Sequence, residues 1–287
     1  MKISVATCHF PVDADISRNE KYVVSQVRSA REFGADVAHF PEACLSGYAG
    51  TDFASYRGFD WPRLEAATLH ILDVAKQTGL WVILGSTHRL TGRHKPHDCV
   101  YIIDSSGRLA DRYDKMFCSG DGNGRSGDLA HYSPGNHFTT FTPKGIRCGV
   151  PICYEYTFPE LYREYKRRGV QLVFHSFHAG HASRKTVKSM AREVGVRFHR
   201  LNAGSRAFSF ARMASSRAAC GETLPACSCQ RWTQTNASTT EHVVGGIARC
   251  VGRSTAARRC AIGGQTRGLS CKGGITSVCS RRRAVPS

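Results

Sequence analysis

The stretch Cys148–Glu155, CGVPICYE, with the residues Tyr156–Glu160 that follow it, YTFPE, decides how the rest of the chain is interpreted. The pattern predicts a buried strand ending at Cys153, a tight turn, and a helix opened by Pro159 and Glu160. A turn from strand to helix exposes one side chain above the sheet edge and directs backbone N–H groups towards it. We therefore expect Cys153 to be a nucleophilic thiol whose pKa the helix N-terminus lowers. The competing interpretation is a small buried hydrophobic residue, the commoner role of a free cysteine.

Two other predicted strands end in charged residues that such a thiol requires. Glu42 follows a short apolar strand in Ala38–Tyr48, AHFPEACLSGY, and Lys115 closes a strand in Arg112–Met116, RYDKM. A carboxylate can take the thiol proton, and an ammonium group can stabilise both the thiolate and a developing oxyanion. Each residue taken singly is interpreted as a solvated charge at a strand end. Their order along the chain with Cys153 favours the chemical interpretation.

The three segments together resemble the carbon–nitrogen hydrolase (nitrilase) superfamily over about residues 1–195. Its pattern is a Glu in P-E-x-x-x-x-G-Y, a Lys in Y-x-K and a Cys in G-x-x-I-C-Y-E-x-x-F-P-E, and all three occur here in order. The resemblance implies a four-layer αββα sandwich, usually with two such subunits packed face to face. It also implies a catalytic triad of Glu42, Lys115 and Cys153 that hydrolyses non-peptide carbon–nitrogen bonds through a thioester, without metal or organic cofactor. Tyr154-Glu155 after the nucleophile resembles the amidase and carbamoylase branches, because true nitrilases tend to carry Trp-Glu there.

Further site residues follow from the same resemblance. Asp128 lies before His131–Gly135, where the family carries a second carboxylate, and is one carbon shorter than the usual glutamate. It could equally be an ordinary turn-forming residue of the loop. The backbone N–H of Tyr154 would complete an oxyanion site with Lys115. Phe177 and His178 lie where the family lines its pocket, as does His175; a papain-like Cys/His pair is the alternative, but no fitting motif surrounds these histidines.

Strands and helices alternate up to about residue 195, which predicts an α/β layer structure. A capping box, Ser17–Glu20, precedes an apolar helical face that ends at Gly34. A second helix is expected over 61–78, then a nearly continuous apolar strand at 81–85, typical of a covered sheet. Further strands are expected at 3–7, 37–41 and 172–175, a hairpin at 100–104 and 109–113, and helices from 159 and 186.

The charge of the chain is divided unevenly along its length. The formal net charge is +18, but residues 196–287 contain 15 Lys and Arg with only two acids, and therefore carry +13 of it. Residues 1–195 carry +5, which is an ordinary enzyme surface. Seven of the 13 cysteines also lie beyond residue 195. The composition therefore predicts a carbon–nitrogen hydrolase domain over 1–195 and a basic, low-complexity tail over 196–287.

We interpret this tail as out-of-frame sequence, disordered and unable to form a packed core. Its Gly, Arg, Ala, Ser and Cys enrichment is what GC-rich codons give in a shifted frame, and another frame permits the R-P-D-G turn of the family. The best strand-like run in it is Glu241–Ile247. The rival interpretation is a genuine basic tail that binds nucleic acid or zinc, but the Cys227-x-Cys229 spacing lacks paired ligands for zinc. Three functions therefore remain open for the chain. It is an active amidase or carbamoylase, a catalytically inactive relative with an incomplete fold, or a nucleic-acid-binding protein.

The remaining features bear on location and partners. No run of 18 apolar residues predicts a membrane span, and Met1-Lys2 leads directly into a strand pattern without a signal-peptide core. We therefore expect a cytoplasmic protein with reduced thiols. Its expected partners are a small amide, carbamoyl or nitrile substrate and, if the fold is complete, a second copy of the chain; a nucleic-acid partner is not expected.

Overall fold

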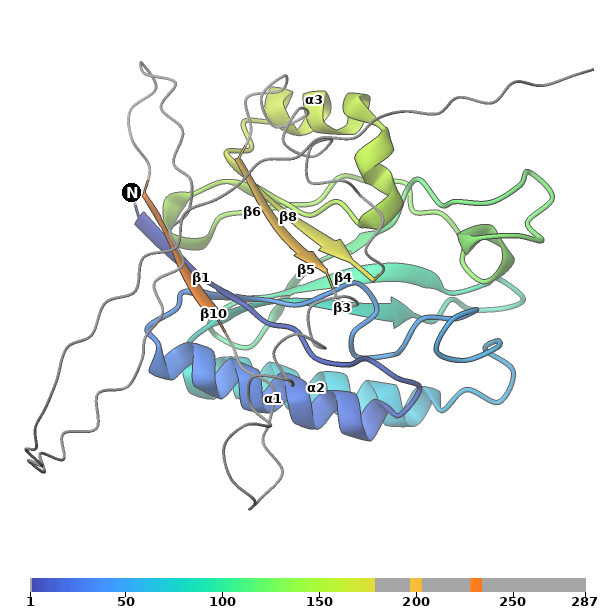
Figure 1. Ribbon diagram of the computed structural model, residues 1–287, viewed down its shortest axis with the longest axis horizontal. Coiled ribbons are helices and arrows are strands. Elements are labelled where there is room, and N and C mark those ends of the chain that lie inside the picture. The colour runs from blue at the N-terminus through green and yellow to red at the C-terminus, as the bar shows by residue number, and fades with distance from the viewer. Residues whose placement is uncertain (1, 179–196, 203–227, 234–287) are drawn as a thin grey trace, which may run out of the picture. The chain divides into compact units, whose positions relative to one another are not determined.

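Two β-sheets, each covered by helices on its outer face, make up the computed structural model, which describes residues 2–178, 197–202 and 228–233 (Figure 1). The first sheet has the order β10-β1-β2-β3-β4-β5 and the second the order β6-β7-β8-β9. The first sheet consists of β1 (Lys2–Thr7), β2 (Val37–His39), β3 (Trp81–His88), β4 (His97–Ile103), β5 (Leu109–Asp114) and β10 (Ser228–Thr233). The second consists of β6 (Thr140–Phe141), β7 (Cys148–Gly149), β8 (Leu172–Phe177) and β9 (Arg197–Asn202).

Three layers of buried side chains hold these elements together. Helices α1 (Ile16–Glu32) and α2 (Trp61–Thr78) pack on the first sheet, where Val23 and Ile71 share a core with Val82 of β3. The next residue of β3, Ile83, faces the opposite way and packs with Phe174 between the two sheets. Successive residues of a strand point to opposite faces, so β3 serves both cores. Helix α3 (Pro159–Arg167) covers the outer face of the second sheet. The predicted four-layer αββα sandwich is confirmed.

The strand directions bring the candidate site residues to one edge of both sheets. In the first sheet β1, β2 and β3 are parallel, and β4 and β5 continue antiparallel as the predicted hairpin. In the second sheet β7, β8 and β9 are parallel. The carboxyl ends of β2 and β8 lead to Glu42 and His178, and the chain beyond β7 leads to Cys153. Ligand-binding residues commonly gather outside the carboxyl ends of such strands.

The helix ends agree with the sequence patterns except at α1. Helix α2 begins after Asp60, whose side chain accepts the backbone N–H of Arg63, and ends at Gly79 in the left-handed conformation. The predicted capping box at Ser17–Glu20 is wrong, because Asp15 is the N-cap and accepts the N–H groups of Ser17 and Arg18. The Glu20 side chain instead contacts Arg63 and His70 of α2 and so joins the two helices.

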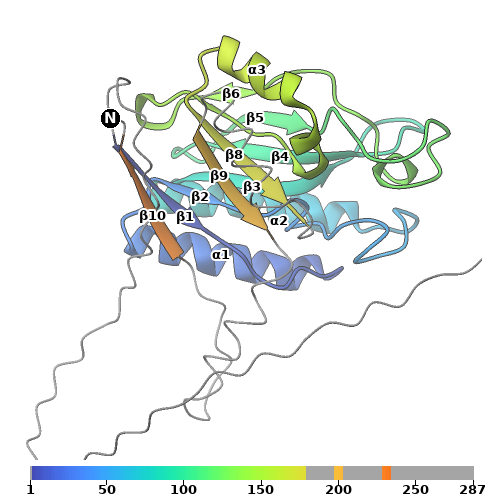
Figure 2. The same ribbon diagram turned by 45° about the horizontal axis from the view of Figure 1, so that its top comes forward.

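Two short segments beyond residue 195 join the sheets as strands that the sequence analysis did not predict. The segment 197–202 pairs in parallel with β8, and 228–233 pairs antiparallel with β1, as Figure 2 shows. The chain divides into a unit Met1–Ile247 and a unit Ala248–Ser287, of which the second lies outside the described residues. The tail that was predicted to be disordered is thus ordered at these two strands, and its remaining residues, with the strand-like run Glu241–Ile247 and the helix expected from 186, lie outside the described residues. The domain boundary at 195 and the out-of-frame origin of the tail stay predictions.

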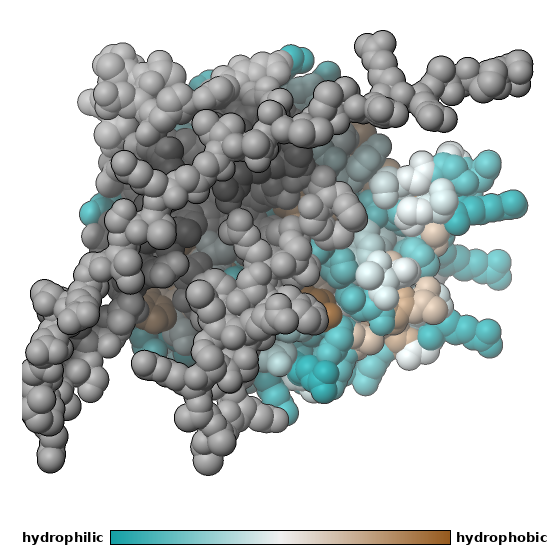
Figure 3. Space-filling view, in the orientation of Figure 1, coloured by the Kyte–Doolittle hydropathy of each residue, from teal (hydrophilic) through white to brown (hydrophobic). Residues whose placement is uncertain are grey.

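Where described residues are visible in Figure 3, mainly on the right of the view, hydrophilic side chains predominate, with smaller hydrophobic areas among them. Exposed large hydrophobic residues do occur, among them Phe33 on α1, Leu69 on α2 and Tyr154 near the end of β7. Within the described ranges, no helix combines the length and apolar character needed to cross a membrane.

Candidate active site

Glu42 is held by the backbone of a neighbouring strand. It lies in the turn after β2, is fully buried, and precedes Ala43, whose φ is +51°. The turn lies directly on Gly85 of β3, where an added Cβ would come within 1.9 Å of the Pro41 carbonyl oxygen and 2.8 Å of the Glu42 Cα. Leu45 donates its N–H to the Gly85 carbonyl oxygen at 3.1 Å. Glycine is therefore required at position 85, and the carboxylate position is set by this close backbone approach.

Lys115 lies at the centre of a buried cluster of carboxylates. It follows β5, is 1% exposed, and donates its backbone N–H to the Asp98 carbonyl oxygen at 2.9 Å. Its Nζ lies 2.7 Å from Glu42 Oε1, 2.9 Å from Asp128 Oδ2 and 3.2 Å from Asp98 Oδ2. Burial disfavours the charge of Lys115, but the carboxylates of Glu42 and Asp98 outweigh burial and raise its pKa well above the ordinary value. Lys115 is therefore a fixed ammonium group.

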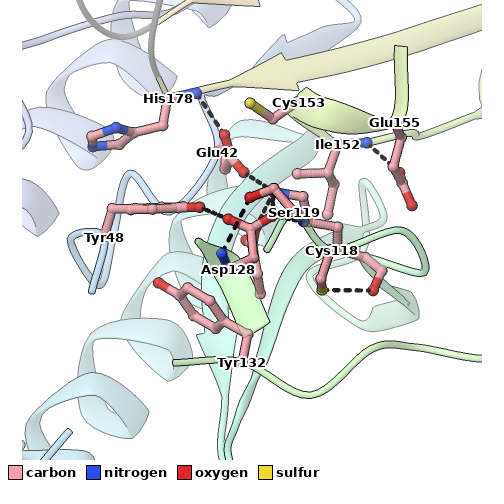
Figure 4. Close-up of polar contacts among 12 residues, drawn as sticks. Glu42, Tyr48, Cys118, Ser119, Asp128, Tyr132, Ile152, Cys153, Glu155 and His178 are labelled. Carbon is pink, nitrogen blue, oxygen red and sulfur yellow. Dashed lines mark hydrogen bonds and ion pairs between the residues drawn. The ribbon is translucent and has the colours of Figure 1, made fainter. Parts of the chain in front are cut away.

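Asp128 reaches this cluster although it is one carbon shorter than a glutamate. It opens the 3-10 helix η1 (Asp128–Ala130) and is buried. Its carboxylate accepts hydrogen bonds from the Tyr48 hydroxyl and from the Ser119 N–H, the latter at 2.9 Å (Figure 4). Burial alone would raise the pKa of Asp128, but the charge of Lys115 and the Tyr48 hydroxyl outweigh it and lower the pKa. Asp128 is thus a buried, ionised second carboxylate rather than an exposed turn former.

Cys153 lies beside Glu42 at the start of the 3-10 helix η3 (Cys153–Thr157), with φ of +39° (Figure 4). A non-glycine residue with positive φ is strained, and such strain concentrates at functional turns. The expectation of a lowered thiol pKa is wrong. Burial raises the pKa of Cys153, and the charge and hydrogen bond of Glu42 raise it further, while Lys115 opposes them. The α-helix predicted after Cys153 begins only at Pro159, so its N-terminus is not at the thiol.

The weaker candidates from the sequence surround Cys153 and Glu42. Phe177, at the end of β8, is buried against Cys153. The backbone N–H of His178 donates to Glu42 Oε2 at 2.7 Å, and its ring stacks on Tyr48 while Nε2 lies 3.0 Å from Asp52 Oδ2. Tyr154 keeps a half-exposed side chain that packs edge-on against Phe158. Figure 4 shows His178 and Cys153 on the same side of the Glu42 carboxylate.

His175 contacts the backbone of the cysteine turn. Its Nε2 lies 3.2 Å from the Cys153 carbonyl oxygen, and its Nδ1 lies 3.2 Å from the Tyr162 hydroxyl. These contacts tie the end of β8 to the turn and to α3. Glu42 lies beside the Cys153 side chain and interacts with it, so the neighbour suited to accept the thiol proton is a carboxylate, unlike the papain-like arrangement.

Asp98 and Glu155 are buried charged groups of the site that the sequence analysis did not single out as site residues. Asp98 lies in β4, and its Oδ1 has no hydrogen-bond partner among the described residues. Glu155 accepts four donors: the Tyr113 hydroxyl and the N–H groups of Met116, Phe117 and Ile152. An acidic residue within an apolar strand, as in HDCVYII, was the available sequence signal for Asp98.

The three carboxylates of the cluster surround an ammonium group. The described part of the chain holds no group of three or more His, Cys, Asp or Glu side chains placed to bind a metal ion. Glu42, Asp98 and Asp128 surround the Lys115 ammonium group, which takes the central position between them.

Comparison with known proteins identifies the family of the chain. The carbon–nitrogen hydrolase family model matches residues 4–200. Among curated proteins, the chain is 31% identical over 112 residues to the deaminated glutathione amidase of Yersinia enterocolitica, covering 36% of this chain and 38% of that one. It is 27% identical over 173 residues to the omega-amidase NIT2 of Mus musculus, covering 59% and 61%. The chain thus spans less than two thirds of either relative.

Solved structures of an amidase from Nesterenkonia sp. share the fold. One matches with a TM-score of 0.60 at 21% identity, covering 71% of this chain and 76% of that one. An alanine variant of the same amidase, solved in complex with butyramide, matches with a TM-score of 0.61 at 21% identity. The layered architecture is that of the amidase structures, and the family model covers more than half the length of the chain. The chain belongs to the carbon–nitrogen hydrolase family.

Proposed function

We propose that this chain hydrolyses the carbon–nitrogen bond of small amides or N-carbamoyl compounds through a thioester on Cys153. The observation that carries the proposal is the position of Cys153 beside a buried Glu42 that also contacts Lys115 at 2.7 Å. A nucleophile, a base within hydrogen-bond reach of it and a fixed cation form the minimal set for acyl transfer. The raised pKa of Cys153 means that the thiol is protonated at rest, so a base must act during attack.

In the acylation half, Glu42 takes the Cys153 proton as the sulfur bonds to the carbonyl carbon of the substrate. The carbonyl oxygen becomes an oxyanion, which accepts hydrogen bonds from Lys115 Nζ and the Tyr154 N–H. Glu42 then gives its proton to the leaving nitrogen, the carbon–nitrogen bond breaks, and ammonia or an amine departs. Each proton transfer runs between groups in contact, so no free acid or base from solvent is needed.

In the deacylation half, Glu42 takes a proton from water while the water oxygen adds to the thioester carbon. The same oxyanion site stabilises the second tetrahedral intermediate. The carbon–sulfur bond breaks, the acid product leaves, and the thiolate recovers its proton from Glu42. One carboxylate serves both halves because Lys115 and the His178 N–H hold its two oxygens in place.

The substrate class rests on the resemblance and the relatives. Tyr154-Glu155 resembles the amidase and carbamoylase branches, the two curated relatives are amidases by name, and the butyramide complex is of an amidase. Asp128 and Phe177 help to position such a substrate, because Asp128 contacts Lys115 and Phe177 packs against Cys153.

The test is ammonia release by the full-length chain across an amide, N-carbamoyl and nitrile panel. Cys153→Ala should lower kcat/KM by about 10³-fold or more, because it removes the nucleophile. Cys118→Ser is the matched control, since Cys118 is the other partly accessible thiol among the described residues. Equal loss in both variants, turnover of nitriles alone, or no turnover by the native chain would contradict the proposal; the last outcome identifies the inactive relative.

A further inference from the structure

Three carboxylates surround the Lys115 ammonium group in the resting site. Its Nζ donates hydrogen bonds to Glu42 and Asp98 and forms an ion pair with Asp128 at 2.9 Å. The oxyanion proposed above needs a donor of the same group. It must therefore compete with these carboxylates for Lys115. The Asp98 contact, at 3.2 Å, is the longest of the three.

The charges of the cluster do not balance if every carboxyl group is ionised. Three carboxylates against one ammonium leave a net charge of −2, and all four side chains are at most 5% exposed. Excess charge of one sign is costly in such a site, and the usual relief is that one acid remains protonated. Two carboxylates in contact commonly share one proton for the same reason.

Asp98 is the member with the fewest donors to stabilise a negative charge. Glu42 accepts from Lys115 and from the His178 N–H, and Asp128 accepts from Tyr48 and from the Ser119 N–H. Asp98 has the single long contact to Lys115, and its Oδ1 has no hydrogen-bond partner among the residues described. An unpartnered Oδ1 is what a protonated carboxyl group would present beside a neighbouring carboxylate.

We propose that Asp98 is the neutral, protonated member of this cluster and a positioning residue that leaves one Lys115 N–H exchangeable for the substrate oxygen. This deepens the amidase function proposed above and rests on it. A neutral carbonyl oxygen is a weaker acceptor for an ammonium than a carboxylate. The developing oxyanion can therefore displace Asp98, whereas Glu42 and Asp128 keep their ionic contacts and hold Lys115 in place.

The groups that face Asp98 support this assignment. Burial raises the pKa of Asp98 well above its ordinary value, Lys115 opposes the rise, and Glu42 and Asp128 add to it. Other titratable groups also interact with Asp98: Tyr48, Tyr56, Tyr132, Cys99, Cys118 and Cys153. Lys115 is the one cation among these groups, and it is shared with two other carboxylates.

Asp98→Asn tests the proposal, with Asp128→Asn as the matched comparison at the same ammonium group. Asparagine is neutral, has the same shape and keeps an oxygen for Lys115. Asp98→Asn is therefore expected to retain kcat/KM within about threefold, whereas Asp128→Asn, which removes an anionic contact, should lose about 10²-fold. The pH profile separates positioning from packing. The alkaline decline of the native protein, caused by ionisation of Asp98, should move to higher pH in Asp98→Asn.

A second readout does not depend on turnover. The carboxyl resonance of Asp98, in full-length protein labelled with ¹³C-aspartate and assigned by its loss in Asp98→Asn, should report a protonated acid at neutral pH. An ionised Asp98, an Asp98→Asn loss as large as that of Asp128→Asn, an unmoved alkaline limb, or an Asp98→Asn chain that does not fold would each overturn the inference. If the native chain releases no ammonia, the amidase proposal fails while the resonance still decides the protonation state.

Discussion

Lys115 and Glu155 are two buried ionisable side chains of the site, and they are stabilised by different kinds of partner. Lys115 contacts three ionisable side chains, Glu42, Asp98 and Asp128, which come from three separate parts of the chain. Glu155 has no cation as a hydrogen-bond partner in the described structure. It accepts three backbone N–H groups and the Tyr113 hydroxyl at 2.7–3.2 Å.

These partners suit Lys115 to a proposed role in the reaction and Glu155 to a structural role. Contacts between ionisable side chains can exchange protons and partners, while backbone donors are fixed by the fold. Glu155 joins the loop after Lys115, through Met116 and Phe117, to the turn before Cys153, through Ile152. It therefore holds the two sides of the site at their separation, and Lys115 lies between them as the proposed oxyanion donor.

Removing the charge of Lys115 should have the largest effect. Lys115→Met leaves the buried carboxylates of Glu42 and Asp128 without their cation and removes the proposed oxyanion donor. We expect kcat/KM to fall by about 10³-fold and the free energy of unfolding to fall by about 3–5 kcal/mol. Ammonia release and denaturant unfolding measure the two losses.

Lys144→Met is the control, because Lys144 makes an exposed ion pair with Asp36. An exposed pair contributes about 0–1 kcal/mol. Equal effects of the two substitutions would remove the distinction between the buried cluster and an ordinary ion pair.

Glu155→Gln should mainly destabilise the protein. The new amide N–H groups would face backbone donors, leaving at least two buried polar groups unsatisfied at about 1–3 kcal/mol each, or about 4 kcal/mol in all. Glu160→Gln, on the exposed start of α3, should be nearly neutral. Urea unfolding of both variants checks this, and a stable, inactive Glu155→Gln protein would show that Glu155 reacts rather than braces.

The pH dependence of stability should carry the signature of Glu155. Burial raises its pKa from 4.5 to about 7 in the folded protein, against the opposing effect of its donors. The folded state thus binds the proton more tightly than the unfolded state. The stabilisation from protonated Glu155 is fully present below pH 4.5, falls as pH rises to about 7, and then levels off. At ~1.4 kcal/mol per pKa unit, the fall amounts to about 3 kcal/mol. Unfolding curves at several pH values measure it, and stability that rises over this range would contradict the assignment.

Tyr113→Phe should give the smallest effect and sharpen the previous one. It removes one donor to Glu155 and is expected to cost about 1.5 kcal/mol at neutral pH. The Tyr113 hydroxyl lowers the pKa of Glu155, so its loss should move the pH-dependent decline upward. Parallel unfolding curves of the native and variant proteins show the shift. An unmoved decline would assign it to another group.

The residues of the proposed triad could be located from the sequence because each follows a strand. Glu42, Lys115 and Cys153 come after β2, β5 and β7, so local patterns located all three. Asp98 could not be ranked in the same way. The burial of Asp98 depends on the pairing of its strand with Thr87 of β3 and on the approach of Glu42, and both are contacts between distant parts of the sequence.

Other differences have similarly physical reasons. Asp15 and Ser17 are both good N-cap residues two positions apart, and only the backbone conformation at Asp15 decided between them. The thiol pKa of Cys153 was predicted in the wrong direction because burial and Glu42 outweigh any helix terminus. The strands at 197–202 and 228–233 lack an apolar pattern, so their pairing with β8 and β1 left no periodic signal.

Gly85 has a consequence for how this site can vary over time. A methyl group there would stand 1.9 Å from the Pro41 carbonyl oxygen, so the turn that carries Glu42 is aligned against main chain rather than against side chains. Main-chain geometry changes far less than side-chain volume as a core accumulates substitutions. Substitutions that change the size of neighbouring side chains should therefore leave the Glu42 carboxylate in place, whereas a single methyl group at position 85 should displace it. The position of the proposed base thus depends more on one glycine than on the volume of the surrounding core.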